Sequence, residues 1–129
     1  MDKPFQVNAD TAILPSHLPL PIPGHGSLAI NAFLLKSQQP VLIDTGMGIE
    51  ADEFMSALES LIDPSEIQWI WITHDDADHI GNLEAVLARA PKAKIITNII
   101  GVARMETSWH INLGMVHLVN PGETLDVGD

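Results

Sequence analysis

The segment at residues 73–82, THDDADHIGN, decides both the fold and the chemistry expected of this chain. It gathers two histidines and three aspartates within six positions, from His74 to His79, and Gly81 lies just beyond. Single aspartates before a helix are ordinary N-caps, and single histidines usually lie on the surface or in the core. Carboxylates this close together repel one another unless a cation or several donors compensate. The cluster therefore predicts a metal site.

The cluster joins a strand to a helix. Residues 67–73 (IQWIWIT) are apolar on both faces, which is typical of a strand buried inside a sheet. A helix follows the cluster and is stopped by Pro91. Its apolar positions recur at helical spacing: Leu83, Val86, Leu87 and Ala90. The end of a strand followed by a helix is where open α/β sheets place their sites.

The remaining segments continue this alternation of strands and helices. We predict a long helix from Glu50, with its apolar face on Phe54, Ala57, Leu58, Leu61 and Ile62, and a short helix from Asn98 to about Met105. Further strands are predicted at residues 5–8, 11–14, 27–35, 40–44, 94–97 and 115–119. The order of two hairpin strands followed by βαβαβ predicts an α/β fold.

Two apolar features receive ordinary structural interpretations. The proline-rich segment at residues 18–24 is predicted to be a surface loop, because prolines lack the N–H that a sheet requires. Trp69 and Trp71 share one face of their strand, and aromatic pairs at this spacing usually pack in the core. We therefore predict core packing for both tryptophans.

Length and composition limit the class of protein. The 129 residues suit one domain, and a hydrophobic content of 46% suffices for a core. No apolar run reaches the roughly 18 residues of a membrane span, and the N-terminus lacks the pattern of a signal peptide. A cytoplasmic protein without membrane contact is the expectation. Because the chain has no cysteine, a bound metal must use histidine, carboxylate or water.

The charge of the chain disfavours nucleic acid as a partner. Seventeen acidic residues against six basic ones give a formal net charge of −11, which repels polyanions within the screening distance. Most of this charge is expected to form a solvated surface that keeps the protein soluble. We therefore expect a small-molecule substrate rather than nucleic acid.

The spacing of the cluster predicts how its ligands converge. In near-extended backbone His74 and Asp76 lie on the same side, because side chains repeat every second residue. Asp78 and His79 come where the chain turns into the helix, so they approach from another direction. These two pairs of nitrogen and oxygen donors could surround one or two metal ions.

At these residues the sequence resembles the metallo-β-lactamase superfamily, whose signature HxHxDH follows a buried strand, with Thr before it and Gly after it. Residues 74–79 read HDDADH here. Residues 41–46 (VLIDTG) are similar to the strand-turn motif before the family's first helix, and residues 122–125 (GETL) to a later turn. The resemblance implies the N-terminal half of an αββα sandwich, a mixed β-sheet with flanking helices. Residues 1–129 would form a single, C-terminally incomplete domain.

The resemblance also implies roles for single residues. His74 matches the first ligand of one metal site, and Asp78 and His79 match two ligands of the second. Asp76 stands where the family usually has histidine; some hydrolase-like members have aspartate there, and the flavodiiron branch has glutamate. A carboxylate still binds zinc but shifts the preference toward iron or manganese. The resemblance implies two zinc ions in the complete domain, with iron or manganese as alternatives.

Neighbouring polar residues are assigned supporting roles. Asp44 resembles the family's turn aspartate, which braces the metal loop by hydrogen bonds rather than binding metal. Asp75 is expected to face solvent or to support the ligands from behind. The family's further ligands follow the segment that matches residues 122–125. The other histidines match no ligand position and are interpreted as surface or packing residues: His17, His25, His110 and His117.

The function implied is metal-assisted hydrolysis. Metal lowers the pKa of a bound water, and Asp78 would orient the resulting hydroxide toward an ester, thioester, lactone or lactam. Two alternatives stay open: a di-iron oxygen-binding or redox protein, suggested by Asp76, and a non-catalytic metal-binding fragment. A half-sheet exposes an edge and an apolar face, which predicts oligomerisation or domain exchange.

Overall fold

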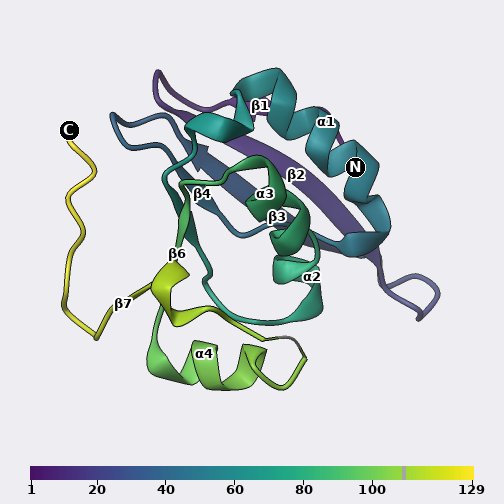
Figure 1. Cartoon of the computed structure of the whole chain (residues 1–129). Coiled ribbons are helices and arrows are strands. Elements are labelled where there is room, and N and C mark those ends of the chain that lie inside the picture. Colours follow the sequence, from purple (N-terminus) through teal and green to yellow (C-terminus); the bar gives the residue numbers. More distant parts are fainter. Residues whose placement is uncertain (109) are drawn as a thin grey trace.

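A single mixed sheet organises the chain, whose computed structural model describes residues 1–108 and 110–129 (Figure 1). Within this described part, seven strands lie side by side in chain order. Their bounds are β1 (Phe5–Gln6), β2 (Thr11–Pro19), β3 (Ser27–Leu35), β4 (Val41–Ile43), β5 (Trp69–Trp71), β6 (Lys94–Thr97) and β7 (Val116–Leu118). The predicted α/β fold is confirmed.

Strand direction changes at β4. The strands β1 to β4 pair antiparallel, as hairpins allow, whereas β4 to β7 pair parallel. Parallel neighbours need crossover connections, and helices supply them. The helices are α1 (Ala51–Leu61), α2 (Ala77–Ile80), α3 (Leu83–Arg89) and α4 (Ile99–Met105), with short 3-10 turns η1 (Gly48–Glu50), η2 (Pro64–Glu66) and η3 (Leu113–Met115). The parallel half therefore carries the loops at which sites form in α/β sheets.

The core lies between one face of the sheet and a layer of helices. Leu42, Ile70 and Ile95 are direct neighbours in β4, β5 and β6, and all are fully buried. Phe54 and Leu58 of α1 belong to the same buried cluster. Figure 1 shows α1 and α3 in front of the sheet. The predicted helical face of α1 is confirmed at its buried positions, because every third or fourth residue turns toward the sheet.

The sheet extends further into the proline-rich segment than the sequence predicted. Strand β2 continues through Pro19, which pairs with Ser27 of β3. The carbonyl of Pro15 accepts a hydrogen bond from Asp2 N, on the side of β2 away from β3. The N–H and C=O of one residue point the same way in an antiparallel strand, so Pro15 and Pro19 remove no bond to β3. The prediction of a loop from residue 18 was wrong for the two residues Leu18 and Pro19.

The prediction of core packing was wrong for Trp71. Its face of the sheet is not the one that the helices cover, and the residue is 46% exposed. Trp69 is half-buried, and its Nε1 donates to Gln39 Oε1 at 2.8 Å. Its ring packs edge-on against the ring of His117, with 5.6 Å between the ring centroids. Alternation along β5 places both tryptophans on this second face, opposite the buried Ile70.

No membrane-crossing helix is found among the described residues. The longest helix there, α1, has 11 residues, well short of the roughly 20 that span a bilayer.

Candidate metal centre

Two loops at the C-terminal ends of β4 and β5 build the candidate centre. The first begins at Asp44, directly after β4, and the second runs from Ile72 to the start of α2 at Ala77. Backbone hydrogen bonds join the first loop to α2 and to the residue that follows it: Thr45 N donates to His79 O at 2.7 Å, and Gly81 N donates to Gly46 O at 2.9 Å. The parallel pairing of β4 with β5 brings the loops together, since both strands end at the same edge.

The side chain of Asn82 joins the end of α2 to the loop after β4. Its side chain is buried, and its Nδ2 donates to the carbonyls of Thr45 at 2.8 Å and Met47 at 3.0 Å. Both of these acceptors belong to the first loop, whereas Asn82 follows α2. A buried amide with both donors satisfied fixes the position of α2 relative to β4.

Asp44 holds the second loop with its carboxylate. It is the one non-glycine residue with positive φ, at 61°, among the described residues. Its Oδ1 accepts from Thr73 N at 2.9 Å, and its Oδ2 accepts from Thr73 Oγ1 at 2.6 Å and pairs with His79 Nδ1 at 2.9 Å. The side chain is only 5% exposed. Aspartate tolerates the left-handed backbone better than most residues do. These hydrogen bonds join the turn after β4 to Thr73 and to His79.

The four residues predicted as ligands lie together. One donor atom from each of His74, Asp76 and Asp78 lies within 4.8 Å of the other two. His74 Nε2 is 3.5 Å from Asp76 Oδ2, and His79 Nε2 is 3.7 Å from Asp78 Oδ2. The two imidazole rings lie 4.1 Å apart, between centroids. The short helix α2 is what turns Asp78 and His79 toward His74.

A second set of donors overlaps with the first but is less suited to a metal. Asp44, His74 and His79 also have donor atoms within 4.8 Å of one another. The Asp44 carboxylate, however, already makes the hydrogen bonds described above, and binding a metal would require it to give some of them up. We therefore take His74, Asp76 and Asp78, with Nε2 of His79 beside them, as the candidate ligand set. Imidazole and carboxylate donors together fit a divalent transition metal.

Asp75 points away from this set. Its Oδ1 accepts from Arg104 Nε of α4 at 2.7 Å. It also lines a cavity of about 370 Å³ together with Glu84 and Ser108. Within the described residues, Asp76 and Asp78 form no ion pair with a lysine or arginine. Arg104 thus compensates one of the three clustered carboxylates and leaves two facing the histidines.

The other histidines lie outside both donor sets. His17 pairs with Asp2 at 2.8 Å, and His110 lies 3.5 Å from Glu106. His25 is exposed in the turn between β2 and β3. His117 packs against Trp69, as described above. These placements agree with their interpretation as surface or packing residues.

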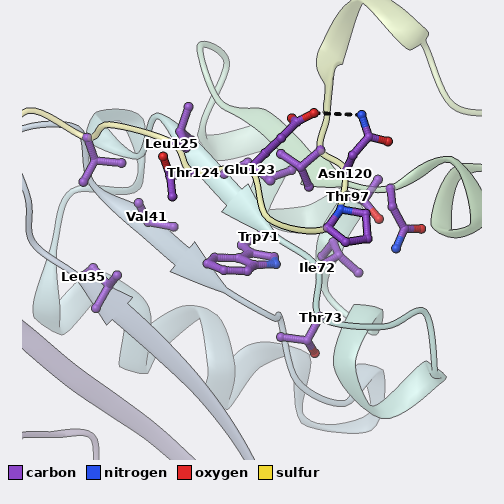
Figure 2. Close-up of a pocket in the computed structure, with 15 residues that line it drawn as sticks. Leu35, Val41, Trp71, Ile72, Thr73, Thr97, Asn120, Glu123, Thr124 and Leu125 are labelled. Atoms are coloured by element: carbon purple, nitrogen blue, oxygen red, sulfur yellow. Dashed lines mark hydrogen bonds between the residues drawn. The ribbon is translucent and has the colours of Figure 1, made fainter.

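Two features around the centre were not predicted from the sequence. Thr73 joins Asp44 to His74, since its Oγ1 lies 3.0 Å from His74 Nδ1. The only signal was its position immediately before the cluster. Thr73 and Trp71 also line a largely apolar cavity of about 530 Å³. Figure 2 shows the indole of Trp71 there, among Val41 and the C-terminal segment around Leu125.

Comparison with known proteins points to iron-dependent redox proteins. A flavo-diiron protein of Clostridium acetobutylicum is 34% identical over 99 residues, which are 77% of this chain and 25% of that protein. An anaerobic nitric oxide reductase flavorubredoxin of Salmonella typhi is 32% identical over 99 residues, 77% of this chain and 21% of that protein. The chain thus spans about a quarter of the length of the curated relatives it matches.

A solved structure of an oxidoreductase contains the same fold. The rubredoxin oxygen:oxidoreductase from Desulfovibrio gigas superposes with a TM-score of 0.85 at 26% identity, over 98% of this chain and 33% of that one. The fold of the present chain therefore recurs in about a third of an oxidoreductase.

These relatives overturn the prediction of a hydrolase. Their names describe di-iron proteins and oxidoreductases, so the comparisons favour the redox alternative that Asp76 had suggested. The role of Asp78 in orienting an attacking hydroxide is withdrawn with that prediction. The prediction of zinc is corrected as well, because the Clostridium acetobutylicum relative is named as a di-iron protein. The relatives are named as a reductase and an oxidoreductase, which agrees with the broader prediction of an enzyme.

The resemblance noted in the sequence is confirmed for the family. The model of the metallo-beta-lactamase superfamily matches residues 25–123, which include the loop after β4, the metal loop and the turn at Gly122. The chain belongs to the metallo-beta-lactamase superfamily.

Proposed function

We propose that this chain is part of an iron-dependent oxidoreductase of the flavo-diiron type, and that His74, Asp76, Asp78 and His79 are iron ligands. The observation that carries the proposal is the convergence of His74, Asp76 and Asp78 within 4.8 Å at the end of β5. The identity to flavo-diiron and flavorubredoxin proteins supports iron as the metal. Bound iron would supply the one-electron redox chemistry that reduces dioxygen or nitric oxide.

The balance of donors suits this assignment. Histidine combined with carboxylate is the donor set of non-haem iron sites, and carboxylates stabilise the higher charge of oxidised iron better than neutral ligands do. Asp76 and Asp78 supply two negative charges, and neither pairs with a lysine or arginine in the described part of the chain. The two aspartates would therefore neutralise the metal, while the two histidines orient it.

Exposure of the ligands fits a site that exchanges small molecules. The side chain of His74 is 46% exposed and that of Asp76 is 62% exposed, whereas His79 is 19% exposed. His79 and Asp78 thus form the sheltered side of the centre, and His74 and Asp76 its open side. Four protein donors leave coordination positions on two ions for water, oxidant or further ligands.

The first test is metal binding by the chain itself. The chain is purified without oxygen, stripped with a chelator and titrated with Fe(II), and bound iron is measured by elemental analysis. We expect near-stoichiometric iron in the wild type and its loss in the His74→Ala/Asp78→Ala double variant. His25→Ala is the matched control, because His25 lies in an exposed turn far along the chain from the cluster. It should bind iron like the wild type.

The outcomes separate the parts of the proposal. Equal iron in the wild type and the double variant would show that the ligand assignment is wrong. Zinc without iron in protein grown with both metals would reject the choice of metal. If the iron binds but Fe(II) is not oxidised by dioxygen or nitric oxide faster than in the double variant, the redox function fails and only metal binding stands.

A further inference from the structure

A chain of hydrogen bonds connects both histidines of the centre to one carboxylate. His74 Nδ1 lies 3.0 Å from Thr73 Oγ1, which donates to Asp44 Oδ2 at 2.6 Å. His79 Nδ1 lies 2.9 Å from the same Oδ2. The path runs from His74 through its neighbour Thr73 to Asp44, which is 29 positions from Thr73, and on to His79, which is 35 positions from Asp44. It lies on the side of the histidines away from Asp76 and Asp78.

The directions of these bonds follow from the number of protons. A carboxylate only accepts, so the proton between Asp44 and His79 belongs to His79 Nδ1. The hydroxyl of Thr73 has one proton, and it points at Asp44. Toward His74 the same oxygen can only accept, so His74 Nδ1 must also carry a proton. The other carboxylate oxygen, Oδ1, is held by the backbone N–H of Thr73.

The consequence appears at the opposite ring nitrogens. A neutral imidazole protonated on Nδ1 presents its lone pair at Nε2. Nε2 of His74 faces Asp76 at 3.5 Å, and Nε2 of His79 faces Asp78 at 3.7 Å. Two acceptors that face each other repel, unless a cation lies between them and takes both lone pairs. The network thus prepares both rings to bind metal through the same atom.

We propose that Thr73 is a positioning residue that fixes His74 in the Nδ1–H tautomer and thereby directs its Nε2 to the metal. Asp44 does this directly for His79, but its carboxylate reaches His74 only through the Thr73 hydroxyl. The fixed tautomer matters most for His74, because that side chain is 46% exposed and has little packing to orient its ring. The inference rests on the proposed metal site and names a residue that supports it without touching the metal.

The test reads the tautomer directly. Long-range proton–nitrogen correlation spectra of the metal-free chain at about pH 8.5, above the ordinary imidazole pKa of about 6.5, distinguish Nδ1–H from Nε2–H rings. Signals of the six histidines are assigned with single His→Gln variants. We expect Nδ1–H for both His74 and His79 in the wild type. In Thr73→Val, which keeps the shape and loses the hydroxyl, His74 should populate Nε2–H while His79 stays unchanged.

Matched variants and a metal titration complete the test. Thr73→Ser keeps the hydroxyl and should keep the wild-type tautomer of His74. Fe(II) affinity should fall about 10- to 100-fold in Thr73→Val, as is typical when a group that orients a metal ligand is lost, and should recover in Thr73→Ser. If Thr73→Val unfolds at the same temperature as the wild type, its spectra report the tautomer and not a loss of structure. If Thr73→Val does not fold, the same measurements are made on Thr73→Ala.

The results distinguish this inference from the proposed function. If His74 remains in the Nδ1–H form in Thr73→Val, or is already Nε2–H in the wild type, the inference is overturned even if iron binds. If the tautomers behave as expected but no iron binds to the wild type, the hydrogen-bond network stands and the proposed function fails.

Discussion

At the scale of single residues, Gly81 determines how close the end of α2 can come to the loop after β4. A Cβ added to Gly81 would lie 2.2 Å from Gly48 N, 2.6 Å from Gly46 O and 2.7 Å from the carbonyl carbon of Met47. All three are backbone atoms, which cannot rotate away as a side chain can. The hydrogen bond from Gly81 N to Gly46 O depends on this approach. Glycine is therefore required here for space rather than for a positive φ.

Substitution of Gly81 tests this contact. Gly81→Ala should lower the free energy of unfolding by about 1–3 kcal/mol, the usual cost of overpacking, because the loops must separate. It should also weaken Fe(II) binding, since α2 carries Asp78 and His79. Urea unfolding and metal titration measure the two effects. Gly48→Ala is the control on the other side of the same contact: its Cβ would meet nothing nearer than 3.3 Å, so a loss as large as that of Gly81→Ala would contradict the steric argument.

At the scale of elements, short capped turns position the longer helices and strands. The 3-10 turn η2 connects α1 to β5, and Asp63 caps its start. Oδ1 of Asp63 accepts from Ser65 N at 3.0 Å and from Ser65 Oγ at 2.9 Å. The backbone N–H of Ser65, and to a smaller extent its hydroxyl, hold the pKa of Asp63 below its ordinary value of 3.8, because both donors favour the charged form.

The lowered pKa of Asp63 gives stability a defined dependence on pH. The charged form is favoured by folding, so the contribution is fully present above pH 3.8 and is lost as pH falls through the lower folded value. Asp63→Ala should therefore be less stable than the wild type at neutral pH, and the difference should shrink below about pH 3.8. Chemical unfolding at several pH values measures it. Asp63→Asn keeps the acceptor without titrating; a difference from the wild type that does not change with pH would contradict the assignment.

At the scale of the whole molecule, the dominant feature is the excess of negative charge. Six basic residues oppose 17 acidic ones, and the two arginine ion pairs, Arg89 with Glu59 and Arg104 with Asp75, lie at the surface. Exposed pairs of this kind contribute little to stability, about 0–1 kcal/mol each. Repulsion among the remaining carboxylates therefore acts on the compact state as a whole.

Added salt should stabilise the metal-free chain for this reason. Raising NaCl from about 0.01 M to 0.15 M shortens the screening length from about 30 Å to about 8 Å and weakens the repulsion. We expect the Tm to rise over this range, as measured by circular dichroism. Because salt also weakens the two arginine pairs, the variant Arg89→Gln is a useful control and should show a slightly larger rise. A Tm that falls with salt would mean that attractive pairs outweigh the net charge.

The sequence by itself determined the order of elements and the identity of the candidate ligands. Both are local properties: the helical period of α1 and the continuous apolar run of β5 can each be read within one segment, and His74 to His79 lie within six positions. The same holds for Asn98, whose side chain caps α4 by accepting from Gly101 N at 2.8 Å. One local prediction failed where a partner strand decides, in β2, because pairing with β3 carries the strand through Pro19.

Only the tertiary structure decided which residues support the ligands and which face of the sheet stays open. Thr73 and His79 meet Asp44 across 29 and 35 positions, and Asn82 meets Thr45 across 37. No pattern within one segment encodes such contacts, because the parallel pairing of β4 with β5 creates them. The exposure of Trp71 was equally hidden, since alternation shows that two residues share a face but not whether helices cover it. The choice between hydrolase and oxidoreductase needed the relatives, because the same imidazole and carboxylate donors can hold zinc or iron.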